Sequence, residues 1–159
     1  MYKNRSTGDM ISIHCLFGEI DEVFQILDDG YIPTSDEAER IVRNIIFELR
    51  LQYLEKLFTH KSLQNLDIKA MTIDCLSVMV GAFRDNSREA IELFDFLFEN
   101  KIIDKFTKVD SFEYLSYSAF LSTSMTALQY FKSKGVPPPE NEWEAELYAK
   151  IPPLSKSVI

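Results

Sequence analysis

Glycine is scarce in this chain, with only 5 among 159 residues. Because a many-stranded β-sandwich needs frequent turns, so low a content argues against that class. Long apolar runs are missing too, since no stretch approaches the roughly 18 consecutive apolar residues of a membrane-spanning helix. Residues 1–9 are polar and lack the apolar segment of a secretory signal. We therefore expect no membrane partner and a cytoplasmic location.

Cysteine and histidine are equally rare, and the sequence holds two of each: Cys15, Cys75, His14 and His60. Two cysteines give no disulfide framework, and their apolar helical contexts favour buried thiols in a reducing compartment. None of these four residues shows the C-x2-C or H-x3-H spacing that is typical of zinc sites. We expect structural roles for these side chains, and neither a metal nor a cofactor.

Motifs that carry catalysis are missing from the sequence. It contains no G-x-S-x-G nucleophile turn and no G-x-x-x-x-G-K-S/T phosphate loop. Asp28-Asp29-Gly30 lacks the alternating oxygen ligands of a calcium loop. The sequence therefore predicts a protein that is not an enzyme.

The charge of the chain is strongly negative, at −8. Nucleic acid is an improbable partner for such a protein, because phosphate binding needs a positive face. An acidic surface keeps a protein soluble, and it also suits a basic protein partner.

What the sequence does contain is helical periodicity, most clearly between Gly18 and Gly30. Apolar residues recur there at helical spacing, with acidic residues on the other side. Gly30 stands where a helix would end in a left-handed conformation, and Pro33 follows. Together with a short helix over residues 10–17, this stretch predicts one helical hairpin.

Three further units follow the first. Thr34 and Glu37 form a capping-box pattern before residues 36–63, which are either one long helix or two. A third unit is expected from Ile68 to Lys101, with a helix over residues 68–82 and a cap at Asn86 or Ser87. A fourth is expected to begin with Asp110 as a cap and Glu113 at the third position, and to end at Gly135.

The second helices of these units share a register. Their closing residues, at positions 30, 61, 101 and 135, are separated by 31, 40 and 34 residues. Seven residues before each closing position the sequence has an apolar side chain: Val23, Leu54, Phe94 and Leu128. Repeats of about 35 residues are typical of stacked helical hairpins.

The pattern G-x-I-D-x-V-x-x-I-L-D-D-G over residues 18–30 resembles the second half of an ankyrin repeat, and Gly135-Val136-Pro137 resembles its ending. Lys61 and Lys101 replace closing glycines, so the repeats are degenerate. The resemblance implies a single all-α domain over residues 1–159, an ankyrin-like α-solenoid of about four stacked antiparallel helical hairpins. A polar tail (1–9) would precede the repeats (10–137). A C-terminal segment (138–159), with a helix capped by Asn141, would cover the last hairpin through Trp143 and Leu147.

The same resemblance implies a binding surface. In ankyrin-like proteins the first helices and the connections between units line the concave side. The corresponding residues here are mostly acidic, with two tyrosines that could also be packed: Asp29, Tyr31, Asp36, Glu37, Glu39, Asp67, Asp74, Asp110, Glu113 and Tyr117.

In size, charge and lack of catalytic motifs, the chain is similar to bacterial immunity proteins, which neutralise a cognate toxin. This implies a monomer that binds a basic, nuclease-type toxin domain one to one and covers its active site. The alternative is an ankyrin-like scaffold or adaptor that binds a host or regulatory partner through apolar contacts.

Overall fold

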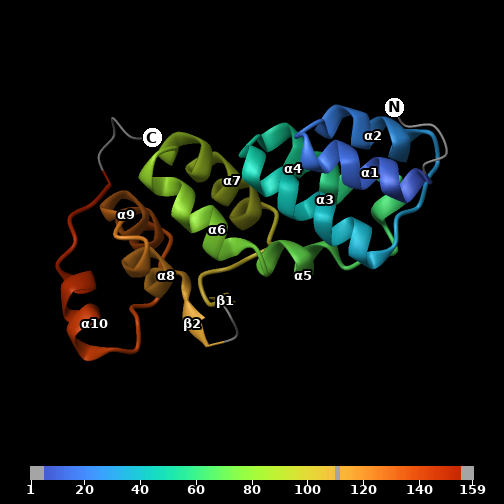
Figure 1. Cartoon of the computed structure of the whole chain (residues 1–159). Coiled ribbons are helices and arrows are strands. Elements are labelled where there is room, and N and C mark those ends of the chain that lie inside the picture. Colours follow the sequence, from blue (N-terminus) through green and yellow to red (C-terminus); the bar gives the residue numbers. More distant parts are fainter. Residues whose placement is uncertain (1–5, 110–111, 155–159) are drawn as a thin grey trace. The chain divides into compact units, whose positions relative to one another are not determined.

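The structure, a computed structural model, describes residues 6–109 and 112–154, so the predicted cap Asp110 lies outside the described residues. The fold is mostly helical (66%). Across those two ranges it has ten α-helices, two short 3-10 helices and one two-stranded sheet (Figure 1). None of the described helices is both long and apolar enough to cross a membrane.

The chain forms two compact units, Met1–Thr72 and Ile73–Ile159. Unit 1 contains α1 (Thr7–Leu16), α2 (Ile20–Asp28), α3 (Ser35–Glu48), α4 (Leu51–Thr59) and the 3-10 helix η1 (Lys61–Leu63). Helix α5 (Ile68–Ile73) lies at the boundary. Within unit 1, α1 packs against both α2 and α3 (Figure 1), so the first predicted hairpin is confirmed.

Local sequence signals set the helix ends of unit 1. Gly30 adopts the predicted left-handed conformation (φ 103°), which glycine reaches at little cost. The capping box of Thr34 and Glu37 is formed in full at the start of α3. Residues 36–63 contain two helices rather than one, because Leu49 turns the chain with φ 53°. A non-glycine residue in that conformation has no sequence signature, which is why the break could not be predicted.

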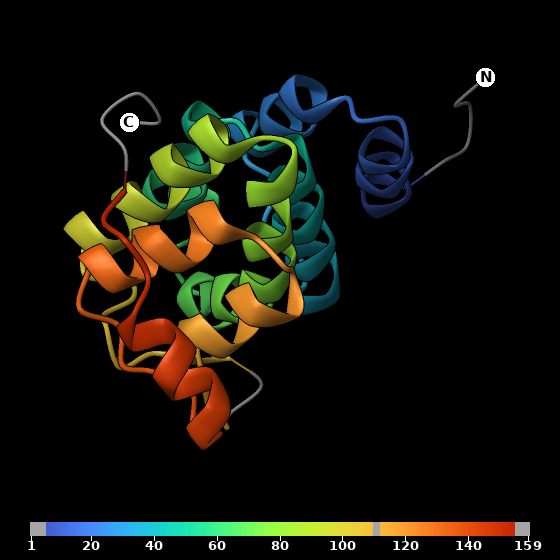
Figure 2. The same ribbon diagram turned by 90° about the vertical axis from the view of Figure 1, so that its left-hand side faces the viewer.

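Unit 2 contains α6 (Leu76–Gly81), η2 (Ala82–Arg84), α7 (Ser87–Glu99), α8 (Leu115–Leu121), α9 (Met125–Ser133) and α10 (Glu142–Ala149). Within this unit α6 packs against α8 and α7 against α9. Figure 2 shows the α8–α9 pair in orange and α10 in red. Between α7 and α8, strands β1 (Lys108–Val109) and β2 (Glu113–Tyr114) pair antiparallel, with Lys108 opposite Tyr114.

Two predicted helices of the later units are wrong in extent. The helix predicted over residues 68–82 is interrupted at Asp74 and Cys75, between α5 and α6. The helix predicted to start at Asp110 starts at Leu115 instead, because Glu113 pairs with Val109 in the small sheet. Glu113 is therefore a strand residue that precedes α8, and not the third residue of a helix.

The predicted register of the second helices is confirmed in the cores of the units. Val23, Leu54, Phe94 and Leu128 are exposed by 0, 1, 0 and 6%. Lys101 has φ 57° and Gly135 has φ 79°, so both closing positions turn the chain as Gly30 does. The exception is Lys61, which begins η1.

The C-terminal helix is held differently from the prediction. Asn141 caps α10 as expected, by accepting a hydrogen bond from the Glu144 N–H. Trp143 and Leu147 do not cover the last hairpin, since Trp143 is 69% exposed and Leu147 is also exposed. Tyr148 is buried in their place, and its hydroxyl donates to the Val136 carbonyl at 2.8 Å. Tyr148, and not Trp143 or Leu147, is therefore the packed side chain of α10.

Candidate functional site: the end of helix α2

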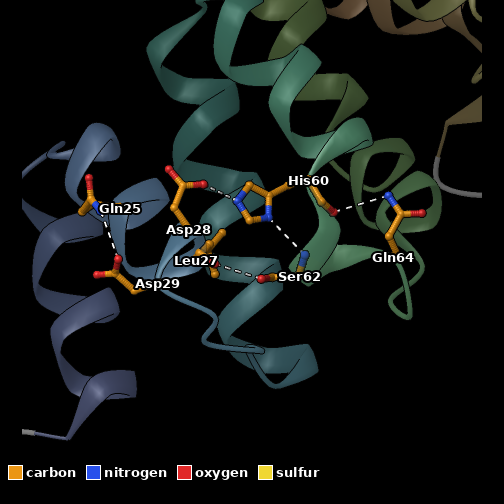
Figure 3. A network of polar contacts seen from close by, with 7 residues as sticks. All are labelled: Gln25, Leu27, Asp28, Asp29, His60, Ser62 and Gln64. Atoms are coloured by element: carbon orange, nitrogen blue, oxygen red, sulfur yellow. Dashed lines mark hydrogen bonds and ion pairs between the residues drawn. The ribbon is translucent and has the colours of Figure 1, made fainter.

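The C-terminal end of α2 is fastened to the turn after α4 by a network of polar contacts (Figure 3). His60 Nε2 lies 2.8 Å from Asp28 Oδ1, and His60 Nδ1 accepts the Ser62 N–H at 3.1 Å. The Ser62 hydroxyl donates to the Leu27 carbonyl at 3.0 Å. Two helices that are separated in the sequence are thereby joined at one point.

The protonation of His60 follows from these partners. Since Nδ1 accepts a backbone N–H, the ring proton lies on Nε2 and is donated to Asp28. Both ring nitrogens are engaged, and the side chain is 13% exposed. In this arrangement neither nitrogen can take a proton from a substrate. The ring instead acts as a cap for η1.

One face of this end of α2 is hollowed into a pocket of about 800 Å³, here called the lysine pocket. Phe24 and Leu27 are buried at its base, and the Lys56 ammonium lies 5.1 Å from the centre of the Phe24 ring. The full lining is Phe24, Leu27, Asp28, Gly30, Ile32, Lys56, Thr59, His60, Lys61, Ser62 and Asn65.

Asp29, which follows Asp28 at the end of α2, lines a second pocket of about 600 Å³, here called the acidic pocket. Its Oδ1 accepts the Gln25 amide at 3.2 Å (Figure 3). Met10 and Ile26 supply apolar surface, and Glu22 a second carboxylate. The full lining is Thr7, Met10, His14, Glu22, Gln25, Ile26, Asp29, Gly30 and Tyr31.

Three of the predicted surface residues come together at this pocket. Asp29 and Tyr31 line it, and the Tyr31 hydroxyl donates to Glu37 Oε1 at 2.8 Å. This hydrogen bond to a carboxylate is the main reason that the pKa of Tyr31 is raised. Glu37 also accepts the Thr34 N–H at 2.9 Å, so it is a capping residue as well as a neighbour of the pocket.

The other predicted residues that the structure describes do not line this pocket. Asp36 and Glu39 are exposed on α3, and Asp67 accepts the Ala70 N–H at the start of α5. In unit 2, Asp74 is exposed after α5, Glu113 lies in β2 and Tyr117 is half-buried on α8. Glu113 Oε2 is buried with no hydrogen-bond partner among the residues that the structure describes.

Sequence reasoning missed Glu22, Lys56, Ser62 and the pairing of Asp28 with His60. Asp28 and Glu22 read as ordinary acidic residues of a helix surface, and Ser62 carries no motif. The one available signal was the break after α4, where His60 precedes a short polar stretch. Among residues 6–109 and 112–154, no group of three or more histidine, cysteine or acidic side chains is placed to hold a metal.

Comparison of the chain with protein-family models, curated proteins and solved structures gives no match.

Proposed function

We propose that this protein is a protein-binding module, an immunity protein that neutralises a basic, nuclease-type toxin by covering its active site. It would act in the cytoplasm as a monomer in a one-to-one complex, without catalysis of its own. The observation that carries the proposal is the acidic pocket of unit 1, which combines two carboxylates, a tyrosine and an apolar base.

The electrostatics of that pocket suit a lysine or arginine side chain. Within the described part of the chain, neither Glu22 nor Asp29 is in an ion pair, and Asp29 has only the neutral Gln25 amide as a partner. His14 is paired with Glu19 at 3.0 Å. The aliphatic stem of a basic side chain would lie on Met10 and Ile26 while its charged end reaches the carboxylates.

As part of the same proposal, the hairpins stack as an ankyrin-like solenoid. Helix packing inside each unit supports this arrangement. In unit 1 the first helices α1 and α3 pack side by side, and the second helices touch through the stacked rings of Phe24 and Tyr53. In unit 2 the first helices α6 and α8 and the second helices α7 and α9 pair in the same manner. Stacking of like helix on like helix is how repeat proteins build an extended binding surface.

The scaffold or adaptor function is favoured by a different observation. Several large apolar side chains are exposed, among them Phe17, Phe112 and Trp143. Exposed aromatic residues are frequent at protein interfaces, and contacts through them depend little on salt. The two functions therefore differ in their response to ionic strength.

The test is capture of a partner from an extract of the source organism at about 0.1 M and about 1 M salt, where the screening length falls from about 10 Å to about 3 Å. Wild type would be compared with E22K/D29K and with the matched variant E140K/E146K. Glu140 and Glu146 are exposed acidic residues of unit 2. The captured protein would then be assayed for nuclease activity with and without the bound chain.

We expect a basic protein that elutes at high salt, whose nuclease activity is suppressed by the wild type. The E22K/D29K variant should fail to capture this basic protein, and the E140K/E146K variant should still capture it. If the partner stayed bound at about 1 M salt and both variants still captured it, the adaptor function would be favoured. Capture by E22K/D29K at low salt would refute the role of the acidic pocket.

A further inference from the structure

The lysine pocket has a charge opposite in sign to that of the whole chain. Lys56 and Lys61 bring two ammonium groups to its lining, against one carboxylate, that of Asp28. In the part of the chain that the structure describes, neither lysine is in an ion pair. In a protein of net charge −8, two unpaired cations at one pocket form a local site for an anion.

Asp28 offsets this positive charge only in part, because one carboxylate stands against two ammonium groups. Its side chain is 61% exposed, and its Oδ1 accepts the Nε2–H of His60, which fixes the position of the carboxylate in the wall of the pocket. His60 is itself fixed by the Ser62 N–H, and Ser62 by the Leu27 carbonyl. The wall is therefore preformed, so binding a ligand costs little ordering of the protein.

The rest of the lining is suited to an apolar group. Ile32 is 66% exposed in the lining and is its accessible apolar side chain, whereas Phe24 and Leu27 are 2% and 1% exposed. Lys56 keeps its ammonium within 5.1 Å of the Phe24 ring, so the positive charge lies directly beside the apolar surface. The volume of about 800 Å³ is ample for a small molecule or a peptide end.

We propose that the lysine pocket binds an organic carboxylate that carries an aromatic or aliphatic group. The carboxylate would pair with Lys56 and Lys61, and the apolar group would lie against Ile32. Such a group is present in a free carboxylic acid and in the C-terminal residue of a peptide that ends in an apolar side chain. This site adjoins the acidic pocket at Gly30, which lines both, but it does not depend on the function proposed for the acidic pocket.

The test is a titration of the ¹⁵N-labelled full chain, followed by NMR, with phenylacetate and with a short peptide ending in phenylalanine. Phenylacetamide and the same peptide with an amidated end are the matched neutral ligands. We expect the carboxylates to shift the amide signals of Lys61 and Ser62, which line this pocket and not the acidic pocket, with a Kd below about 10 mM, and the amides to leave them unchanged. Tighter binding of the peptide would identify a protein terminus as the ligand, and equal binding a free acid.

Variants separate this site from general charge effects. K56Q/K61Q should weaken binding of phenylacetate by about tenfold, since both pairing charges are gone. K69Q/K150Q removes the same net charge from two exposed lysines outside the pocket and should bind as the wild type does. E22K/D29K should bind phenylacetate at least as tightly as the wild type, even if that variant fails to capture a basic partner. Equal shifts with the amides, or unchanged binding by K56Q/K61Q, would overturn the proposal.

Discussion

Asp28 and His60 lie 32 residues apart in the sequence, and their side chains meet at 2.8 Å. The histidine does two things at once, since it donates to the carboxylate and accepts the backbone N–H of Ser62. Its ring also lies 5.9 Å from that of Phe24. His60 therefore joins the end of α2 to the turn after α4, beside the hydrogen bond from the Ser62 hydroxyl to the Leu27 carbonyl and the stacked rings of Phe24 and Tyr53.

The first prediction separates the two contacts of His60. H60A should lower the free energy of unfolding by about 1–2 kcal/mol, because it removes both a cap and a hydrogen bond to a carboxylate. H60N should cost about half as much, because asparagine is a good capping residue but is too short to reach Asp28. Urea denaturation followed by circular dichroism measures both. D29N is the control, because the Asp29 carboxylate is bonded to Gln25 and not to His60. If D29N lowered the free energy of unfolding as much as H60A does, the role given to the contacts of His60 would be wrong.

The second prediction concerns the closing residues of the second helices. Lys101 is exposed and adopts φ 57°, where a side chain is strained. K101G should therefore stabilise the protein by about 0.5 kcal/mol, although glycine also makes the unfolded chain more flexible. G30A should destabilise by about 1–2 kcal/mol through the backbone alone, because no atom lies within 4 Å of the added Cβ. Thermal unfolding of the two variants should shift in opposite directions, and shifts of the same sign would refute this reading of the register.

These positions also show how far sequence reasoning reaches in this protein. The left-handed turn at Gly30 and the capping box of Thr34 and Glu37 were predictable, because each depends on neighbouring residues with specific backbone preferences. The break at Leu49 was not, because leucine has no preference for φ above zero and its neighbours in the sequence do not mark a turn. The strand at Glu113 escaped prediction for a related reason: its partner, Val109, decides its conformation.

The candidate site was predicted only in part. Asp29, Tyr31 and Glu37 were found from the position of the connection between hairpins, which is a property of the repeat pattern. The contact of His60 with Asp28 joins distant segments, and no periodicity encodes it. Residues that act through tertiary contacts of this kind become visible only in the folded chain.

A third prediction tests the close approach of α1 to Glu37. A Cβ at Gly8 would overlap Glu37 Oε2, and Glu37 is held in place by Tyr31 and Thr34. G8A should therefore destabilise the protein by about 1 kcal/mol, because the carboxylate must leave its capping position. In an E37A background the same change should stabilise by about 0.5–1 kcal/mol, since alanine is the better helix residue. A double-mutant cycle measured by denaturation checks the change of sign.

A fourth prediction concerns the thiol of Cys15. Burial raises the pKa of Cys15 from its ordinary value of 9.0 to about 11, although Arg40 acts in the opposite direction. Because the thiol ionises at a lower pH in the unfolded chain than in the folded one, the protonated thiol contributes fully to stability below pH 9. That contribution is lost as the pH rises toward 11. In a C75S background, the rate of alkylation of Cys15 should reach half its maximum near pH 11 in the folded protein. In urea the midpoint should fall to near pH 9, and equal midpoints in both states would contradict the burial of this group.

The last prediction separates the two aromatic residues of α10. Tyr148 is 4% exposed and donates to the Val136 carbonyl, and burial raises the pKa of its hydroxyl. Y148F should lower the free energy of unfolding by about 1–1.5 kcal/mol, because the carbonyl of a buried residue loses its donor. W143A should change it by less than about 0.5 kcal/mol, since most of the tryptophan side chain already contacts water. If W143A proved the more damaging of the two in chemical denaturation, Trp143 rather than Tyr148 would be the side chain that fastens α10. A loss of partner capture by W143A at unchanged stability would instead place the tryptophan in an apolar interface, as the adaptor function requires.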